Sequence, residues 1–334
     1  MKIAKKIATG ILIFLLVFVL LIMLLNLFLN LRYAEFYRNS ESVGEVAGIA
    51  DGLAHQGLDY IESCNMLLTS GYMADGSASR IYVNVDGTER YVVLLNEDGS
   101  EYTGHAGGIA HFSDFIYIAT NGGVDVFSLK DVMDGKSSTK LLGHVKLNHD
   151  ASCVTVHNGS LYIGKFSEII KEKTTTPASP EHIIENPNRP GDMNYSAITE
   201  YILDSSATES FGIKSTVPNR IISCTDRLQG FTFTESGNII LSTSWGLTTS
   251  KIYFYNKDIT ATPDGYRIID GTSVPWYFLG EDSLAKTLDA PPMAEEMVII
   301  DGSLYVMNES SSIKYIFGNF TGGRELYAYD LCTK

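Results

Sequence analysis

Residues 151–166 read ASCVTVHNGSLYIGKF, residues 229–244 read QGFTFTESGNIILSTS, and residues 295–310 read EEMVIIDGSLYVMNES. Each stretch holds an alternating apolar strand, a tight turn with glycine, and a second apolar strand. Glycine and its Asn, Ser or Asp neighbour tolerate the positive φ that tight antiparallel turns require. The three stretches therefore predict three β-hairpins of one repeating design.

The same pattern occurs five times along the chain. Its copies start 44 to 78 residues apart, at Gln56, Gly107, Ala151, Gln229 and Glu295. A third apolar strand follows each copy, starting at Ser79, Gly122, Ser196, Ser250 and Ser311, and a fourth is visible at residues 90–96 and 325–330. Repeated four-stranded units are typical of the blades of a β-propeller. The sequence predicts an all-β propeller with five blades; six is the alternative, with another blade in residues 40–55 or between the third and fourth copies.

An insertion interrupts the third copy at residues 167–194. Its central part, residues 171–192, carries four of the nine prolines of the chain. Proline and polar residues at this density favour a loop over a strand. Two interpretations stay open: a solvated excursion, or a lid or partner-binding arm.

The N-terminus predicts a membrane anchor. Residues 7–31 are almost entirely apolar, which is long enough to cross a bilayer, and three lysines precede them. The positive-inside rule then places residues 1–6 in the cytoplasm, residues 7–31 across the cell membrane as a single-pass signal-anchor, and the rest outside. Residues 32–54 are predicted to be a partly helical stalk, and residues 55–334 the extracytoplasmic propeller. A cleaved signal peptide, the alternative, has an apolar region of about 7–15 residues and an Ala-x-Ala-like site.

Charge and cysteine spacing exclude several classes of function. The formal charge is −14 and the 25 basic residues are scattered, so a nucleic acid is excluded as a partner. Four cysteines without C-x-x-C spacing exclude zinc ribbons and thioredoxin-like sites. Disulfides are open outside the membrane, with Cys153–Cys224 preferred because both lie near the starts of successive copies.

The first strand of each copy is predicted to line the central channel, so the starts of the five copies meet at one mouth. That mouth is the predicted ligand site. Nine candidate residues come from these starts: His55, Gln56, His105, His149, Asp150, Arg227, Gln229, Glu295 and Glu296. The ends of the second strands reach the same rim or the neighbouring one and add Trp245, Tyr72, Asn121, Lys165, Asn308 and Glu309.

Three chemistries suit these residues. Imidazole and carboxylate groups hold metals, with Asp150, His149 and Glu295 as the candidate set, and they also act as general acids and bases. Aromatic and amide groups beside carboxylates suit a carbohydrate or a peptide. The alternative without function is that these groups bind one another and channel water. No G-x-S-x-G, P-loop, H-E-x-x-H or EF-hand motif is present, so no catalytic residue is assigned.

The hairpin pattern, with its Gly turn followed by LYV or LYI, resembles the bacterial extracytoplasmic propellers of the SMP-30/gluconolactonase and strictosidine-synthase-like group. This resemblance implies the propeller fold over most of residues 56–331. SMP-30 proteins hold a divalent metal, calcium or another, with carboxylates and an Asn on inner strands. By this resemblance, Glu295 or Glu296 is a candidate for such a carboxylate.

Three hypotheses for function follow. The first is a membrane-anchored module that binds a carbohydrate, a small molecule or a surface protein at its channel mouth. The alternative is a metal-dependent hydrolase of the lactonase or glycoside type, in which the metal activates water or polarises a carbonyl. The third is a structural partner in a membrane complex, acting through its insertion and blade faces.

Overall fold

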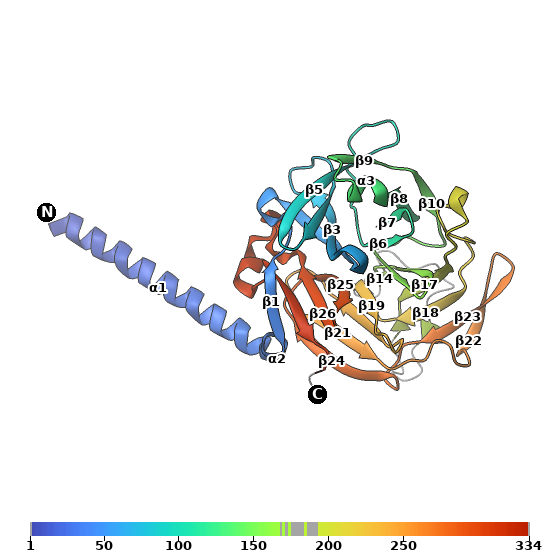
Figure 1. Cartoon of the computed structure of the whole chain (residues 1–334). Coiled ribbons are helices and arrows are strands. Elements are labelled where there is room, and N and C mark those ends of the chain that lie inside the picture. Colours follow the sequence, from blue (N-terminus) through green and yellow to red (C-terminus); the bar gives the residue numbers. More distant parts are fainter. Residues whose placement is uncertain (1, 168, 171–172, 175–183, 186–192, 333–334) are drawn as a thin grey trace.

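The chain forms a five-bladed β-propeller with one long N-terminal helix (Figure 1). The structure is a computed structural model that describes residues 2–167, 169–170, 173–174, 184–185 and 193–332. The five-blade prediction is confirmed. The insertion at 167–194 lies largely outside the described residues, which include only four two-residue strands within it: β13 (Ile169–Ile170), β14 (Lys173–Thr174), β15 (Ile184–Glu185) and β16 (Met193–Asn194).

Each blade is an antiparallel sheet that starts at the central axis. The strands of each blade are given from the innermost outward. Blade 1 consists of β2 (Leu53–Ile61), β3 (Met66–Met73), β4 (Arg80–Val85) and β5 (Thr88–Leu95), and blade 2 of β6 (Ile109–Phe112), β7 (Phe115–Thr120), β8 (Gly123–Ser128) and β10 (Gly143–Lys146). Blade 3 consists of β11 (Cys153–His157), β12 (Ser160–Gly164), β17 (Ser196–Ile202) and β18 (Arg220–Cys224). The last two are β19 (Leu228–Phe233), β20 (Ile239–Thr243), β21 (Ser250–Tyr255) and β24 (Leu284–Ala290); and β25 (Ala294–Ile300), β26 (Ser303–Asn308), β27 (Glu325–Asp330) and β1 (Ser40–Glu45).

The fifth blade departs from the sequence prediction at its third strand. The stretch from Ser311 forms two 3₁₀ segments instead, η5 (Glu309–Ser311) and η6 (Ile313–Thr321). The run of serines before this stretch favours local turns over a strand, because short hydroxyl side chains compete for backbone groups. The third strand is β27, which the sequence presented as a fourth.

The fourth strand of that blade is β1, from the opposite end of the chain. Ser40 pairs with Tyr329 and Glu45 with Glu325, so the N-terminal strand closes the ring onto the C-terminal one. The short helix α2 (Ala34–Arg38) packs beside it, with Phe36 fully buried against the rings of Tyr327 and Tyr329. Residues 34–45 of the predicted stalk therefore belong to the fifth blade or pack against it.

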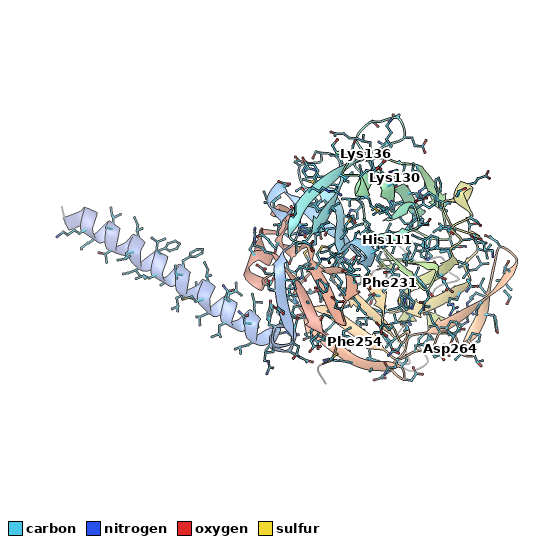
Figure 2. The ribbon with its side chains drawn as sticks, viewed as in Figure 1. His111, Lys130, Lys136, Phe231, Phe254 and Asp264 are labelled. Carbon is cyan, nitrogen blue, oxygen red and sulfur yellow. The ribbon has the colours of Figure 1, made fainter. Side chains whose placement is uncertain are left out.

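Neighbouring blades also exchange strands at their outer edges. Strand β9 (Ser138–Lys140), which follows the short helix α3 (Leu129–Met133), pairs in parallel with β5 of the first blade. The hairpin of β22 (Gly265–Ile269) and β23 (Thr272–Phe278) leaves the fourth blade and pairs in parallel with β18 of the third. Apolar side chains fill the spaces between blades; Phe231, labelled near the centre of Figure 2, is fully buried in one of these clusters.

Helix α1 (Lys2–Arg32) is long and apolar enough to cross a membrane. An 18-residue stretch within Lys5–Arg32 has a mean hydropathy of 3.3, and this stretch projects clear of the propeller (Figure 2). An ion pair of 2.8 Å between Arg32 and Asp289 fixes its base to the fourth blade. A signal sequence near an N-terminus can also form an apolar helix that meets this criterion.

All four cysteines, each among the described residues, are free thiols. The preferred pair, Cys153 and Cys224, lies in one apolar cluster without a disulfide. These two side chains act as small apolar groups in the core, and burial raises the pKa of both thiols.

Candidate ligand site at the channel mouth

One carboxylate closes the centre of the propeller. Glu296 accepts backbone N–H groups from three inner strands: Leu58 at 3.0 Å, Ile109 at 2.8 Å and Val154 at 2.8 Å. Its side chain reaches them past Gly108, where a Cβ would lie 2.2 Å from a carboxylate oxygen. Through these hydrogen bonds, Glu296 of blade 5 links the inner strands of blades 1, 2 and 3.

Glu296 and its neighbour Glu295 both point inward because strand β25 is irregular here. Its register with β26 shifts between Ala294 and Met297, which is the signature of a β-bulge. In a regular strand, consecutive side chains alternate between faces, whereas here both glutamates are buried, with 2% or less of their surface exposed. Because of the bulge, Glu296 points to the centre of the propeller and Glu295 to the channel mouth.

Glu295 lies beside Glu309, and these two buried carboxyl groups form the floor of the candidate site. Glu309 is the first residue of η5, directly after β26, and is 6% exposed. Burial raises the pKa of Glu295 well above its usual range, and the charges of Glu309 and Glu296 raise it further. Burial also raises the pKa of Glu309 to about 7, against the opposing effects of Tyr72 and Lys314.

Three side chains form the rim above this floor. The Tyr72 hydroxyl donates to Glu309 Oε1 at 3.0 Å, and Lys314 Nζ donates to the Tyr72 hydroxyl at 2.6 Å. The exposed ring of His105 stacks on Tyr72 with 4.8 Å between centroids. Desolvation by the neighbouring side chains and the charge of Lys314 lower the pKa of His105, which favours its neutral imidazole.

Buried polar groups without partners lie next to the carboxyl pair. Among the described residues, no group bonds to either side-chain atom of Asn308 or to the hydroxyls of Ser310, Ser311 and Ser312. Asn308 is fully buried. A buried polar atom without a hydrogen bond costs about 1–3 kcal/mol, so native proteins rarely leave one unpaired. This segment is therefore suited to receive water or a polar ligand.

The structure brings some of the predicted residues to this site. His105 and Glu295 meet there, together with Tyr72 and Glu309 from the second-strand ends. Gln56 does not contribute its amide to this group, because that amide donates to the backbone carbonyl of His55 at 2.7 Å.

The two other predicted histidines are buried inside blades. His55 is fully buried, with Nε2 2.9 Å from the Ala47 carbonyl, and burial lowers its pKa to about 4. His149 Nδ1 lies 2.8 Å from the Asp150 carbonyl, and its Nε2 lies 3.0 Å from Thr199 Oγ1. Equivalent positions in the repeat thus did not produce equivalent side-chain directions.

A third group of predicted residues lies apart, over the fourth blade. Arg227 and Trp245 line a separate hollow of about 400 Å³, and Trp245 stacks on Phe166 with 5.9 Å between centroids. Gln229 donates weakly to Ser244 Oγ at 3.4 Å.

The candidate metal ligands Asp150, His149 and Glu295 do not form a cluster. Asp150 accepts the Gly122 N–H at 2.8 Å and pairs with Lys165 at 3.3 Å. Within the part of the chain that the structure describes, no three His, Cys, Asp or Glu side chains are placed to hold a metal ion. These residues therefore do not fit the predicted metal, and a divalent metal stays a prediction.

Sequence reasoning missed Lys314. This residue lies in η6, the stretch that was predicted to be a strand with alternating faces. The only local signal was a lysine shortly after the polar segment 308–312, next to an aromatic residue.

Comparisons with known proteins give similar solved structures but no family. No model of a known family matches the chain, and no curated protein does. The PQQ-bound aldose sugar dehydrogenase of Streptomyces coelicolor is 11% identical, with a TM-score of 0.44, covering 86% of this chain and 96% of that one. Regucalcin, a calcium-binding protein from Agrobacterium tumefaciens, is 14% identical (TM-score 0.39; 83% and 90% covered). A gluconolactonase from Xanthomonas campestris is 12% identical (TM-score 0.39; 87% and 94% covered). A gluconolactonase is thus among the similar structures, as the sequence resemblance predicted, while the five-bladed fold itself is shown by the strand pairing.

The raised pKa of Glu309 predicts a pH-dependent stability. The folded chain holds this proton with a pKa of about 7, against an ordinary value of 4.5. The stabilising contribution is therefore complete below pH 4.5 and is lost as the pH rises through 7. Its size is about 3 kcal/mol, because one pKa unit corresponds to about 1.4 kcal/mol. Thermal unfolding between pH 4.5 and pH 8 should show a smaller loss of stability in Glu309→Gln than in the native chain.

The exposed Glu97→Gln is the matched control for this measurement. It removes the same charge without changing a buried group, so its pH profile should follow that of the native chain. A Glu309→Gln profile parallel to the native one would contradict the assignment.

Proposed function

We propose that this chain is a ligand-binding module, held at a membrane by α1, that binds a small polar ligand at the channel mouth. The observation that carries the proposal is the buried Glu295–Glu309 pair beside the unpartnered Asn308 amide, under the rim of Tyr72, His105 and Lys314. Buried polar groups in this number are stabilised when a ligand supplies their hydrogen bonds.

The chemistry of the floor selects the kind of ligand. Two carboxyl groups and an amide oxygen accept hydrogen bonds, so the ligand should carry several hydroxyl or ammonium donors. The Tyr72 and His105 rings offer a stacked surface at the entrance, which suits the apolar face of such a ligand. An anionic ligand is disfavoured because it would oppose ionisation of the two carboxyl groups, whose pKa values burial already raises.

Binding can be tested with the full-length chain in neutral lipid nanodiscs. The thermal midpoint is measured with calcium, glucose and ethanolamine, three probes that differ in charge and in donor groups. We expect at least one probe to raise the midpoint of the native chain. The shift should disappear in Glu295→Gln and weaken about tenfold in apparent affinity in Tyr72→Phe, since a lost hydrogen bond to a charged group is worth about 1.5–3 kcal/mol.

Tyr91→Phe is the matched control, since Tyr91 is an exposed tyrosine of the same blade and lies away from the mouth. It should bind like the native chain. Mass spectrometry of bound metal, with Glu295→Ala and His149→Ala as variants, separates a metal from an organic ligand. If none of the probes shifts the midpoint, or if each shifts Glu295→Gln as much as the native chain, the proposed site is wrong.

A further inference from the structure

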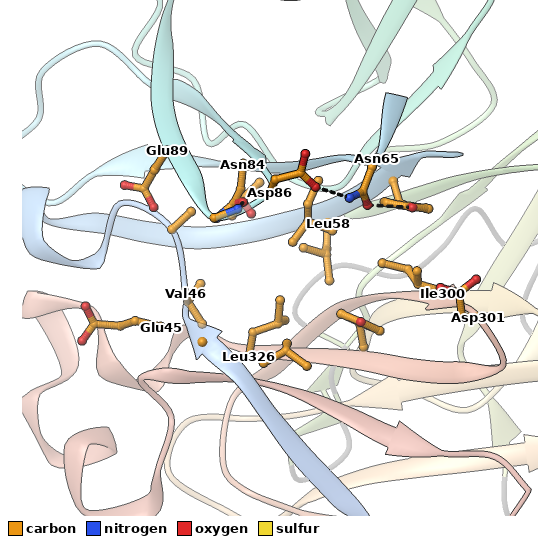
Figure 3. Close-up of a pocket in the computed structure, with 18 residues that line it drawn as sticks. Glu45, Val46, Leu58, Asn65, Asn84, Asp86, Glu89, Ile300, Asp301 and Leu326 are labelled. Atoms are coloured by element: carbon orange, nitrogen blue, oxygen red, sulfur yellow. Dashed lines mark hydrogen bonds between the residues drawn. The ribbon is translucent and has the colours of Figure 1, made fainter. Parts of the chain in front are cut away.

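A second cavity lies at the seam where blade 5 meets blade 1 (Figure 3). It is a groove of about 490 Å³. Its lining includes Asn65 and Asp301, in the turns at the far ends of the inner strands, so it is separate from the channel mouth. The closing strand β1 and the residue after it, Val46, form one wall.

The buried floor of the groove is apolar, and aromatic side chains stand on its walls beside polar ones. Leu58, Val46 and Leu326 are buried beneath it, each with 7% or less of its surface exposed. Tyr60 and Tyr305 stand on the walls and are partly exposed. A ligand in the groove would therefore bury an apolar body against leucine and tyrosine side chains.

The ionisable groups at the edge of the groove are all of one sign. Four exposed carboxylates line it: Glu45, Asp86, Glu89 and Asp301. The described lining residues include no Lys, Arg or His. Among the described residues, Glu45 is the one of these four with a basic partner, Arg324 at 2.5 Å. Asp86 accepts from the amide of Asn65 at 2.5 Å.

The carboxylates also act on groups within the groove. Desolvation raises the pKa of Glu89, and the charges of Asp51 and Glu45 raise it further, against the N–H that Gly48 donates at 3.3 Å. Desolvation likewise raises the pKa of Tyr60, with a contribution from the charge of Asp301. In both cases desolvation is the main cause, and neighbouring negative charges act in the same direction.

We infer that this groove binds a small organic cation, an ammonium or amidinium group on an apolar body. The carboxylates at the edge pair with the charge, the faces of Tyr60 and Tyr305 attract it further, and the leucine floor takes the apolar body. The volume lies within the range of about 300–1,000 Å³ that is usual for small-molecule sites. This site and its ligand are independent of the proposed function at the mouth.

Fluorine NMR can test the inference with the full-length chain in phosphatidylcholine nanodiscs. The probes are para-fluorobenzylammonium, the neutral para-fluorobenzyl alcohol and the anionic para-fluorobenzoate, which share one apolar body. We expect the ammonium to bind at least about tenfold more tightly than the alcohol, because an ion pair and a cation–π contact are each worth about 1 kcal/mol at a partly exposed site. The benzoate should not bind.

The variant Glu89→Gln with Asp301→Asn should weaken binding of the ammonium about tenfold. The matched control, Glu97→Gln with Glu209→Gln, removes the same two charges from exposed positions outside the groove and should bind within about twofold of the native chain. Thermal unfolding of each variant checks that the propeller is intact, and the groove variant also corrects for partition of the probes into lipid. Equal binding of ammonium and alcohol, or equal loss in both variants, would overturn the inference.

Discussion

Replacing Glu296 with alanine is expected to lower the free energy of unfolding by about 5 kcal/mol. The substitution leaves three buried backbone N–H groups, on Leu58, Ile109 and Val154, without an acceptor. Each costs about 1–3 kcal/mol, and the cavity left at the axis adds to the loss. Thermal or urea unfolding of the full-length chain measures the change.

Two variants separate this effect from the burial of charge. Glu296→Gln keeps one acceptor oxygen and should cost about 2 kcal/mol. Glu295→Gln, the matched control, removes a neighbouring buried carboxyl group whose raised pKa marks it as unfavourable when charged, so stability should be unchanged or increased at pH 8. An equal cost for Glu295→Gln and Glu296→Ala would contradict the role of Glu296 as a bond between blades.

Removing β1 is expected to abolish cooperative unfolding. A chain that begins at Val46 exposes the whole edge of β27 and the apolar surface of the fifth blade, and unpaired edges of this kind promote aggregation. A chain that begins at Ser40 keeps the strand and loses only α1 and α2. The shorter chain should elute as aggregates in size-exclusion chromatography and show no sharp thermal transition, while the longer one unfolds in a single step. Similar midpoints for the two chains would show that the ring is stable without its N-terminal strand.

Local sequence patterns predicted most of this fold. Alternation of apolar residues and glycine turns are properties of adjacent residues, so the hairpins starting near Ala151, Gln229 and Glu295 could be placed directly. The closing strand could not, because residues 40–45 are mostly polar and exposed, and their partner lies almost 290 residues away. The β22–β23 hairpin was missed for a related reason: its partner strand belongs to the preceding blade.

The candidate site was predicted less completely than the fold. Repeat position placed Glu295 and His105 at the mouth, but it could not distinguish them from His55 and His149, whose rings turn into the blades to bond backbone and threonine groups. Glu295 and Glu296 take different positions, at the mouth and at the centre, because of a β-bulge. The alternating pattern of a strand does not reveal such a bulge. Lys314 was missed because its segment forms 3₁₀ turns.

The pairing of β1 with β27 fixes the order of events during synthesis. Ser40 and its neighbours leave the ribosome almost 290 residues before their partners near Tyr329. Blades 1 to 4 can assemble in turn from local hairpins, whereas the fifth blade cannot form until β27 has been synthesised. Ring closure is then a single late step, which the chain completes only after its C-terminal strand arrives beside the base of the N-terminal helix.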